Sequence, residues 1–179
     1  MTLGLILAPE NRNDPNSRKI DVHYLRFHAR EEAKLPPLFI LPGGPGGFIG
    51  AAHVRSAAKG QRYSSAAEVI AFNRLRDVVV VNQRGNGKAP IRHKLPARWT
   101  ADAGKYLEPR SQKTAVPRLA DGFAAAVKQC EEQGFDLRGY DILHLVDDVE
   151  AIREAYRYEK IALRGSSFGS QWSLAYHRR

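Results

Sequence analysis

The sequence predicts an α/β fold: a mostly parallel sheet with helices on both faces. First, Leu38–Leu41 and the four valines 78–81 are short apolar runs, which are typical of strands buried on both faces. Second, amphipathic helical patterns alternate with these runs. Third, glycine-rich turns directly follow three predicted strands, at the sheet edge where α/β proteins bind ligands. The 179 residues form one domain or part of one.

The first part of the chain predicts an antiparallel hairpin. Leu3–Ala8 is an apolar run that ends at Pro9, and Glu10–Ser17 is rich in turn-forming residues. Apolar residues then approximately alternate across Lys19–His28, which indicates a half-exposed strand.

Two buried strands follow, each ending in a glycine-rich turn. Leu38–Leu41 leads into the loop 42–47, whose glycines and prolines favour a rigid loop able to point amide groups at an anion. Ala66–Arg74 predicts a short helix, and Asp77–Val81 predicts the next strand, which ends in the turn 82–87.

The last part predicts two helices, a strand and a third helix. After an irregular excursion over about 88–116, Leu119–Gln129 and the next residue form an amphipathic pattern that ends near Gly134. Asp141 is a favourable N-cap for a helix that reaches Tyr156. Lys160–Leu163 predicts the last strand, and the helix after it includes Gln171–Tyr176.

Composition narrows the functional classes. The net charge of +9 comes from scattered basic residues without interleaved aromatics, so we expect no nucleic-acid partner. No apolar stretch approaches the length of a membrane span, and the N-terminus lacks the basic region of a signal peptide. The compartment stays open, with the cytoplasm expected for the sequence as given. Cys130 is the single cysteine, so no intrachain disulfide is possible. We expect neither a cofactor nor a metal.

Ser167 is the candidate catalytic residue. Gly165 and Gly169 frame it in the pattern Gly-x-Ser-x-Gly, which in a strand–turn–helix context exposes a nucleophilic hydroxyl. The alternative is a glycine-bearing loop with chance serines. We interpret the nearby pair Asp147 and Asp148 as polar groups on the helix surface or supporting the site, not as a catalytic carboxylate pair.

Four segments together resemble the α/β-hydrolase serine peptidases of the prolyl and tripeptidyl aminopeptidase kind. They are Ala8–Ile20 as an opening strand–turn–strand, Leu41–Gly47 as a Gly-Gly-Pro-Gly oxyanion loop, Asn82–Gly87 as an Asp-Gln-Arg-Gly-x-Gly turn, and Tyr140–Gly169 as the helix, strand and nucleophile unit. The resemblance implies hydrolysis at peptide N-termini, with a peptide or small ester or amide as substrate. It implies Ser167 as nucleophile, and backbone N–H groups of Phe168 and of Gly43 or Gly44 as oxyanion donors.

Departures from this family pattern affect the expected activity. Asn82 replaces an aspartate that could pair with Arg84, and Arg164 occupies an apolar position, so it needs a polar partner or a cleft. No acidic residue follows Ser167, and His177 lies too far along the same predicted helix to act as its base.

We therefore expect residues 1–179 to be the N-terminal part of a single α/β-hydrolase domain, truncated after the nucleophile helix. Such a chain would be inactive as written, with an exposed sheet edge that favours association. The alternatives are a non-catalytic remnant or interaction module of the same fold, and a phosphate-binding α/β protein. The glycine loops lack the nucleotide-binding patterns, which argues against the last.

Overall fold

The computed structural model describes residues 1–33, 35–60, 64–86 and 112–179. The predicted excursion therefore lies largely outside the described residues. The elements in chain order are β1 (Thr2–Pro9), β2 (Lys19–Phe27), β3 (Leu38–Leu41), α1 (Ala51–Ala58), α2 (Ser64–Phe72), β4 (Val78–Val81), α4 (Gln112–Glu132), the 3₁₀ turn η3 (Leu137–Gly139), α5 (Ile142–Ala155), β5 (Ala162–Gly165) and α6 (Phe168–His177).

The strands form one sheet in the order β1-β2-β4-β3-β5. β3 pairs in parallel with both β4 and β5, whereas β2 is antiparallel to both β1 and β4. Of the described strands, only β2 therefore runs against the others. This arrangement confirms the predicted mostly parallel sheet, and it places the ends of β3, β4 and β5 along one edge.

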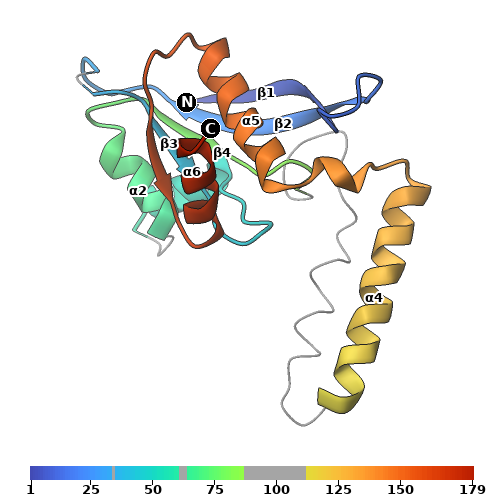
Figure 1. Cartoon of the computed structure of the whole chain (residues 1–179). Coiled ribbons are helices and arrows are strands. Elements are labelled where there is room, and N and C mark those ends of the chain that lie inside the picture. Colours follow the sequence, from blue (N-terminus) through green and yellow to red (C-terminus); the bar gives the residue numbers. More distant parts are fainter. Residues whose placement is uncertain (34, 61–63, 87–111) are drawn as a thin grey trace.

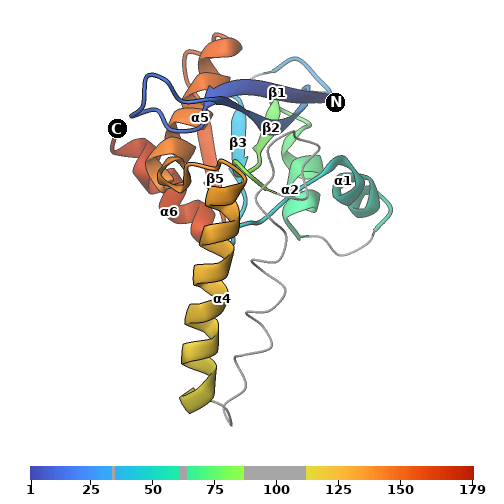
Figure 2. The ribbon, with the colours of Figure 1, turned by 90° about the vertical axis from the view of Figure 1, so that its right-hand side faces the viewer.

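Helices cover both faces of the sheet, as predicted (Figures 1 and 2). α5 and α6 pack on one face, where Trp172 and Ile152 are fully buried against Phe39 and Val79. α1 and α2 pack on the other face, where Val54 and Val69 join a cluster with the remaining strand residues. Burial on both faces explains why β3 and β4 are continuously apolar.

β2 corrects one expectation. The alternating pattern predicted a half-exposed strand, but the residues from Ile20 to Leu25 are all buried. Both faces of β2 are covered, because Tyr24 packs in the cluster with α5 and α6, and Leu25 packs in the cluster with α1 and α2. Polar residues Asp21 and His23 share one face with Leu25 and are each 3% exposed. Polar residues in a strand therefore do not by themselves indicate a solvent-facing side.

The helices differ from expectation in three places. α1 was not predicted, and α4 begins at Gln112, inside the expected irregular stretch. Phe123, expected on a buried face of α4, is 41% exposed, and α4 projects away from the sheet in both views (Figures 1 and 2).

No helix in the described ranges has both the length and the apolar character to span a membrane.

Candidate functional site

Ser167 lies in the turn between β5 and α6. Its backbone has φ 52° and ψ −119°, a conformation that a residue with a side chain adopts only under strain. The serine is exposed, and its side chain makes no capping hydrogen bond with α6. The strand and helix that the sequence motif requires are thus present, with the serine held in a strained turn between them.

The two glycines of the motif are required by close backbone contacts. A Cβ at Gly165 would lie 2.2 Å from the carbonyl oxygen of Gly169, and a Cβ at Gly169 would lie 2.0 Å from the carbonyl oxygen of Leu41. Both distances are far shorter than any van der Waals contact. The spacing of the motif therefore allows β5, α6 and the end of β3 to meet at Ser167.

Backbone amides at the start of α6 donate hydrogen bonds to the carbonyls of the serine turn. Gly169 N–H donates to the Ser166 carbonyl at 2.8 Å, and Ser170 N–H donates to the Ser167 carbonyl at 2.9 Å. The N–H of Phe168 makes no hydrogen bond with a described residue. Helix N-termini leave such donors unpaired, and here one belongs to the residue directly after Ser167.

The glycine loop after β3 packs against the same turn. A Cβ at Gly43 would lie 2.9 Å from the Ser166 carbonyl oxygen and 3.1 Å from the Ser167 Cβ. Gly44 has φ +117°, which favours glycine. Gly47 N–H donates to the Gly43 carbonyl at 3.0 Å, whereas the Gly44 N–H has no partner among the described residues. The structure thus places Gly43 against the turn of Ser167 and Phe168, and Gly44 is the next residue of the same loop.

The turn after β4 holds the glycine loop in place. The Gln83 amide donates to the carbonyls of Pro42 and Gly43 at 3.3 and 3.0 Å, and its oxygen accepts from Gly46 N–H at 2.6 Å. Asn86 donates to the carbonyls of Gly46 and Gly47 at 3.0 and 3.2 Å. Gln83 and Asn86 are both buried. These side chains fix the loop without touching Ser167, a role that the sequence motif did not reveal.

Asn82 anchors the chain just beyond the loop. Its oxygen accepts from the Ile49 N–H at 2.9 Å, and its amide nitrogen lies 3.1 Å from the Ile49 carbonyl and 2.8 Å from Nδ1 of His23. The amide nitrogen donates to both, so Nδ1 of His23 is an acceptor and the ring is neutral. Burial correspondingly lowers the pKa of His23.

We expect this neutral histidine to make the fold acid-sensitive. Because its pKa is lower in the folded chain than the value of about 6.5 in the unfolded chain, the unfolded chain binds more protons below that pH. Stability should therefore fall as the pH drops through about 6.5 and below. Urea midpoints measured between about pH 8 and about pH 5 test this. His23→Gln should flatten the decline, whereas His177→Gln, at an exposed position, should leave it unchanged.

Arg84 has a different carboxylate partner from the one considered in the sequence analysis. It forms a two-pronged pair with Asp148 of α5, with Nε–Oδ2 and Nη2–Oδ1 distances of 2.8 Å each. Its remaining donors reach the carbonyls of Pro9, Glu10 and Gly139. All five guanidinium donors are thus used, and the aspartate absent at position 82 is not needed as a partner.

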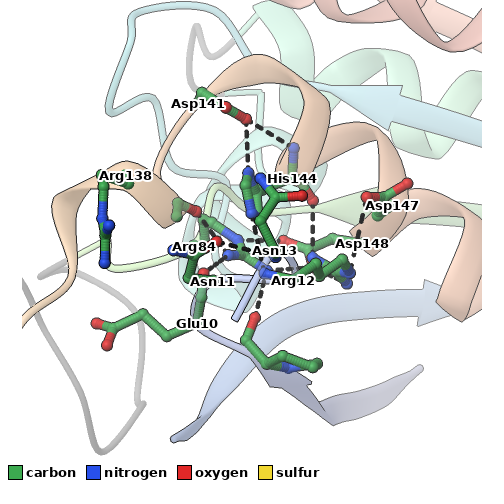
Figure 3. A network of polar contacts seen from close by, with 12 residues as sticks. Glu10, Asn11, Arg12, Asn13, Arg84, Arg138, Asp141, His144, Asp147 and Asp148 are labelled. Atoms are coloured by element: carbon green, nitrogen blue, oxygen red, sulfur yellow. Dashed lines mark hydrogen bonds and ion pairs between the residues drawn. The ribbon is translucent and has the colours of Figure 1, made fainter. Parts of the chain in front are cut away.

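Of the two alternatives for the aspartate pair, Asp148 fits the supporting polar group and not the helix surface. It is 0% exposed, and it also accepts from Arg12 Nη2 at 2.7 Å. Asp147 fits the surface alternative, since it is partly exposed and pairs with Arg179 at 2.8 Å. Figure 3 shows the network, which joins the β1–β2 turn, the turn after β4 and α5. The periodicity of α5 did not reveal it because the partners are distant in sequence.

The N-terminus of α5 belongs to the same network (Figure 3). As predicted, Asp141 is the N-cap, and it accepts from the backbone N–H of His144 at 2.9 Å. The ring of His144 contacts Asp141 through Nδ1 at 2.7 Å and accepts from Arg12 N–H through Nε2 at 3.0 Å. Both ring nitrogens of His144 are therefore engaged in contacts that link the β1–β2 turn to α5.

Arg164 has the polar partner that its position requires. Its Nη2 lies 2.8 Å from Oε1 of Glu68 on α2, and Nη1 donates to the Gly165 carbonyl. Both side chains are partly exposed, at 40% and 29%. The pair links the end of the nucleophile strand to α2.

Four described histidines hydrogen-bond to residues other than Ser167. Hydrogen bonds commit His23 to Asn82, His28 to Thr2, His53 to Gly50 and His144 to Asp141. His177 occupies the opposite end of α6, about 15 Å along the helix axis at the usual rise. His93 lies outside the described residues. Within the described ranges, no group of three or more His, Cys, Asp or Glu side chains is arranged to hold a metal ion.

A shallow apolar groove lies beside β5 and the second half of α6, away from Ser167. It is lined by Ile161, Leu163, Ser173, Leu174, Tyr176 and His177.

Comparison with known families agrees with this geometry. The family model described as alpha/beta hydrolase fold matches residues 36–179. The chain belongs to the α/β hydrolase fold family. The match covers the turn that holds Ser167, the glycine loop after β3 and every described strand from β3 onward. It concerns the fold family as a whole and not a peptidase subfamily. A comparison with curated proteins found no match.

Proposed function

We propose that this α/β hydrolase chain carries the nucleophile and oxyanion-binding part of a serine hydrolase site. The observation that supports the proposal most directly is the strained, exposed Ser167 beside the unpaired Phe168 N–H. A nucleophile needs an accessible hydroxyl with hydrogen-bond donors aimed at the same small volume. Structural turns rarely maintain strain of this kind without a functional reason.

The proposed chemistry is acyl transfer. The Ser167 hydroxyl oxygen attacks a substrate carbonyl carbon and forms a new C–O bond, the carbonyl oxygen becomes the oxyanion, and the hydroxyl proton passes to a general base or to water. When the carbonyl re-forms, the C–N or C–O bond to the leaving group breaks, the leaving group takes up a proton, and water later releases the acyl group from Ser167. The N–H groups of Phe168 and of Gly43 or Gly44 donate to that oxyanion. Loss of one such donor typically lowers the rate by about 10²–10³-fold. Gln83 and Asn86 support this step indirectly, because they hold the loop that carries one of the donors.

The proposed substrate class is peptides cleaved at their N-termini, with small esters or amides as simpler alternatives. The resemblance of the Gly-Gly-Pro-Gly loop and the turn after β4 to the prolyl and tripeptidyl aminopeptidases supports this choice. Hydrogen bonds from Gln83 and Asn86 join the turn after β4 to the Gly-Gly-Pro-Gly loop, so the two motifs form one structural unit.

We expect little turnover from the chain as written. The hydrogen bonds of four described histidines go to groups other than Ser167, and a serine hydroxyl without a general base is a weak nucleophile. Loss of triad members lowers kcat by about 10⁴–10⁶-fold in well-studied serine proteases. The alternative function is an interaction module of the same fold, for which the exposed β5 edge would serve as a contact surface.

A fluorophosphonate probe tests the proposal directly. Attack by Ser167 forms an oxygen–phosphorus bond and releases fluoride, so the adduct is read by mass spectrometry. We expect slow labelling at Ser167, complete loss of the adduct in Ser167→Ala, and unchanged labelling in Ser166→Ala. Ser166 is a matched control because it is the adjacent serine and is also exposed.

Two outcomes would contradict the proposal. A folded protein that never labels would favour the interaction module. Labelling that persists in Ser167→Ala would show that the reactive group lies elsewhere.

A further inference from the structure

The outer edge strand β1 has a row of exposed leucines. Leu3, Leu5 and Leu7 are 52%, 44% and 58% exposed, although each lies opposite a buried residue of β2. The alternate residues face the interior: Gly4 and Ala8 are buried, and Ile6 packs against the cluster under α5. The leucines therefore lie on the opposite sheet face, the face to which Leu25, the partner of Leu3, contributes.

β1 also lacks the features that normally protect an edge strand. It lies at the end of the sheet and pairs only with β2 among the described strands. Natural edge strands are usually short, charged, bulged or interrupted by proline. β1 has eight residues, no charged side chain, and no proline before its last position, Pro9. Among the described strands, none pairs with its outward N–H and C=O groups, which thus form a template for another strand.

We propose that β1 is a self-association strand, which pairs antiparallel with β1 of a second copy of this chain. A twofold axis at Leu5 would place Leu3 of one copy opposite Leu7 of the other and Leu5 opposite itself. A contact of this kind is self-complementary, as a symmetric dimer requires. The paired edges would join two five-stranded sheets into one, and the leucine rows would partly cover one another.

The charge of β1 does not oppose a second copy at this edge. Two chains of net charge +9 repel each other, so a stable contact must form where basic side chains are absent. β1 has no basic residue from Thr2 to Pro9. In contrast, β5 at the other end of the sheet contains Arg164 and is preceded by Lys160.

The mass of the full chain in solution tests the proposal. Light scattering at micromolar concentrations should give a dimer for the wild type and a monomer for Leu5→Lys, with the melting temperature of the variant nearly unchanged. Leu174→Lys, at a 58% exposed leucine of the α6 groove, should remain dimeric. A monomeric wild type, or a dimer that persists in Leu5→Lys, would overturn the proposal. Loss of the dimer only in Leu174→Lys would instead assign the interface to the β5 side.

Disulfide trapping tests the register. Leu5→Cys should form a covalent dimer on mild oxidation, because the two residues at position 5 would face each other. Leu3→Cys and Leu7→Cys should cross-link efficiently when mixed, but poorly when each is oxidised alone. Cys130 is the only native cysteine and is buried, so it should not compete. Equal cross-linking of all three variants alone would contradict the antiparallel register.

Discussion

Asp148→Ala is expected to lower the free energy of unfolding by about 3–5 kcal/mol, the usual effect of breaking a buried ion pair. The variant would leave the guanidinium of Arg84, which is only 1% exposed, without its carboxylate. It would also remove the partner of Arg12, and so loosen the β1–β2 turn from α5. Urea unfolding followed by circular dichroism provides the measurement.

Asp147 is the matched control, because it is adjacent on α5 but partly exposed. Asp147→Ala should cost less than about 1 kcal/mol, as is usual for surface pairs. The double variant Arg84→Met with Asp148→Leu should recover part of the loss, since it removes the unpaired charge as well as the pair. Equal effects of the two single variants would contradict the assignment of Arg84 and Asp148 as the central buried pair.

Gly169→Ala is expected to disturb the nucleophile turn more than any other one-carbon change. Its Cβ would lie 2.0 Å from the Leu41 carbonyl oxygen, so α6 or the end of β3 must move. Overpacking of this kind costs about 1–3 kcal/mol. A displacement of about 1 Å at a reacting group can cost about 100-fold in rate, and we expect a comparable loss in fluorophosphonate labelling of Ser167.

Gly122→Ala is the control for this prediction. A Cβ at Gly122 would meet nothing within 4 Å, and the residue lies inside α4. Alanine there should stabilise the helix by about 0.5–1 kcal/mol and leave labelling unchanged. Gly169→Ala with unaltered labelling would mean that the position of Ser167 does not depend on this close backbone contact.

The sequence predicted much of the framework around Ser167. Leu38–Leu41 was predicted with the observed bounds, and the strand at the four valines was one residue too long, because bounded apolar runs mark strands buried on both faces. The cap at Asp141 was also predicted, since capping depends on neighbouring residues. α1 was missed and β2 was wrongly expected to be half-exposed, because burial depends on what packs over an element.

The supporting polar groups could not be predicted from local pattern. Arg12 and Asp148 are 136 positions apart, and Gln83 reaches Gly43 from 40 positions away. No periodicity or spacing relates such pairs. The sequence analysis therefore recognised the turn 82–87 as a motif without identifying what its side chains hold.

The sequence by itself determined the α/β class, the glycine loop and the placement of Ser167 between a strand and a helix. These features depend on apolar period and on glycine spacing, which operate over a few residues. Only the tertiary structure decided the partners of Arg84, Asp148 and Asn82, and the approach of Gly43 to the serine turn. Those contacts form only when distant segments pack together, so their geometry depends on the assembled sheet.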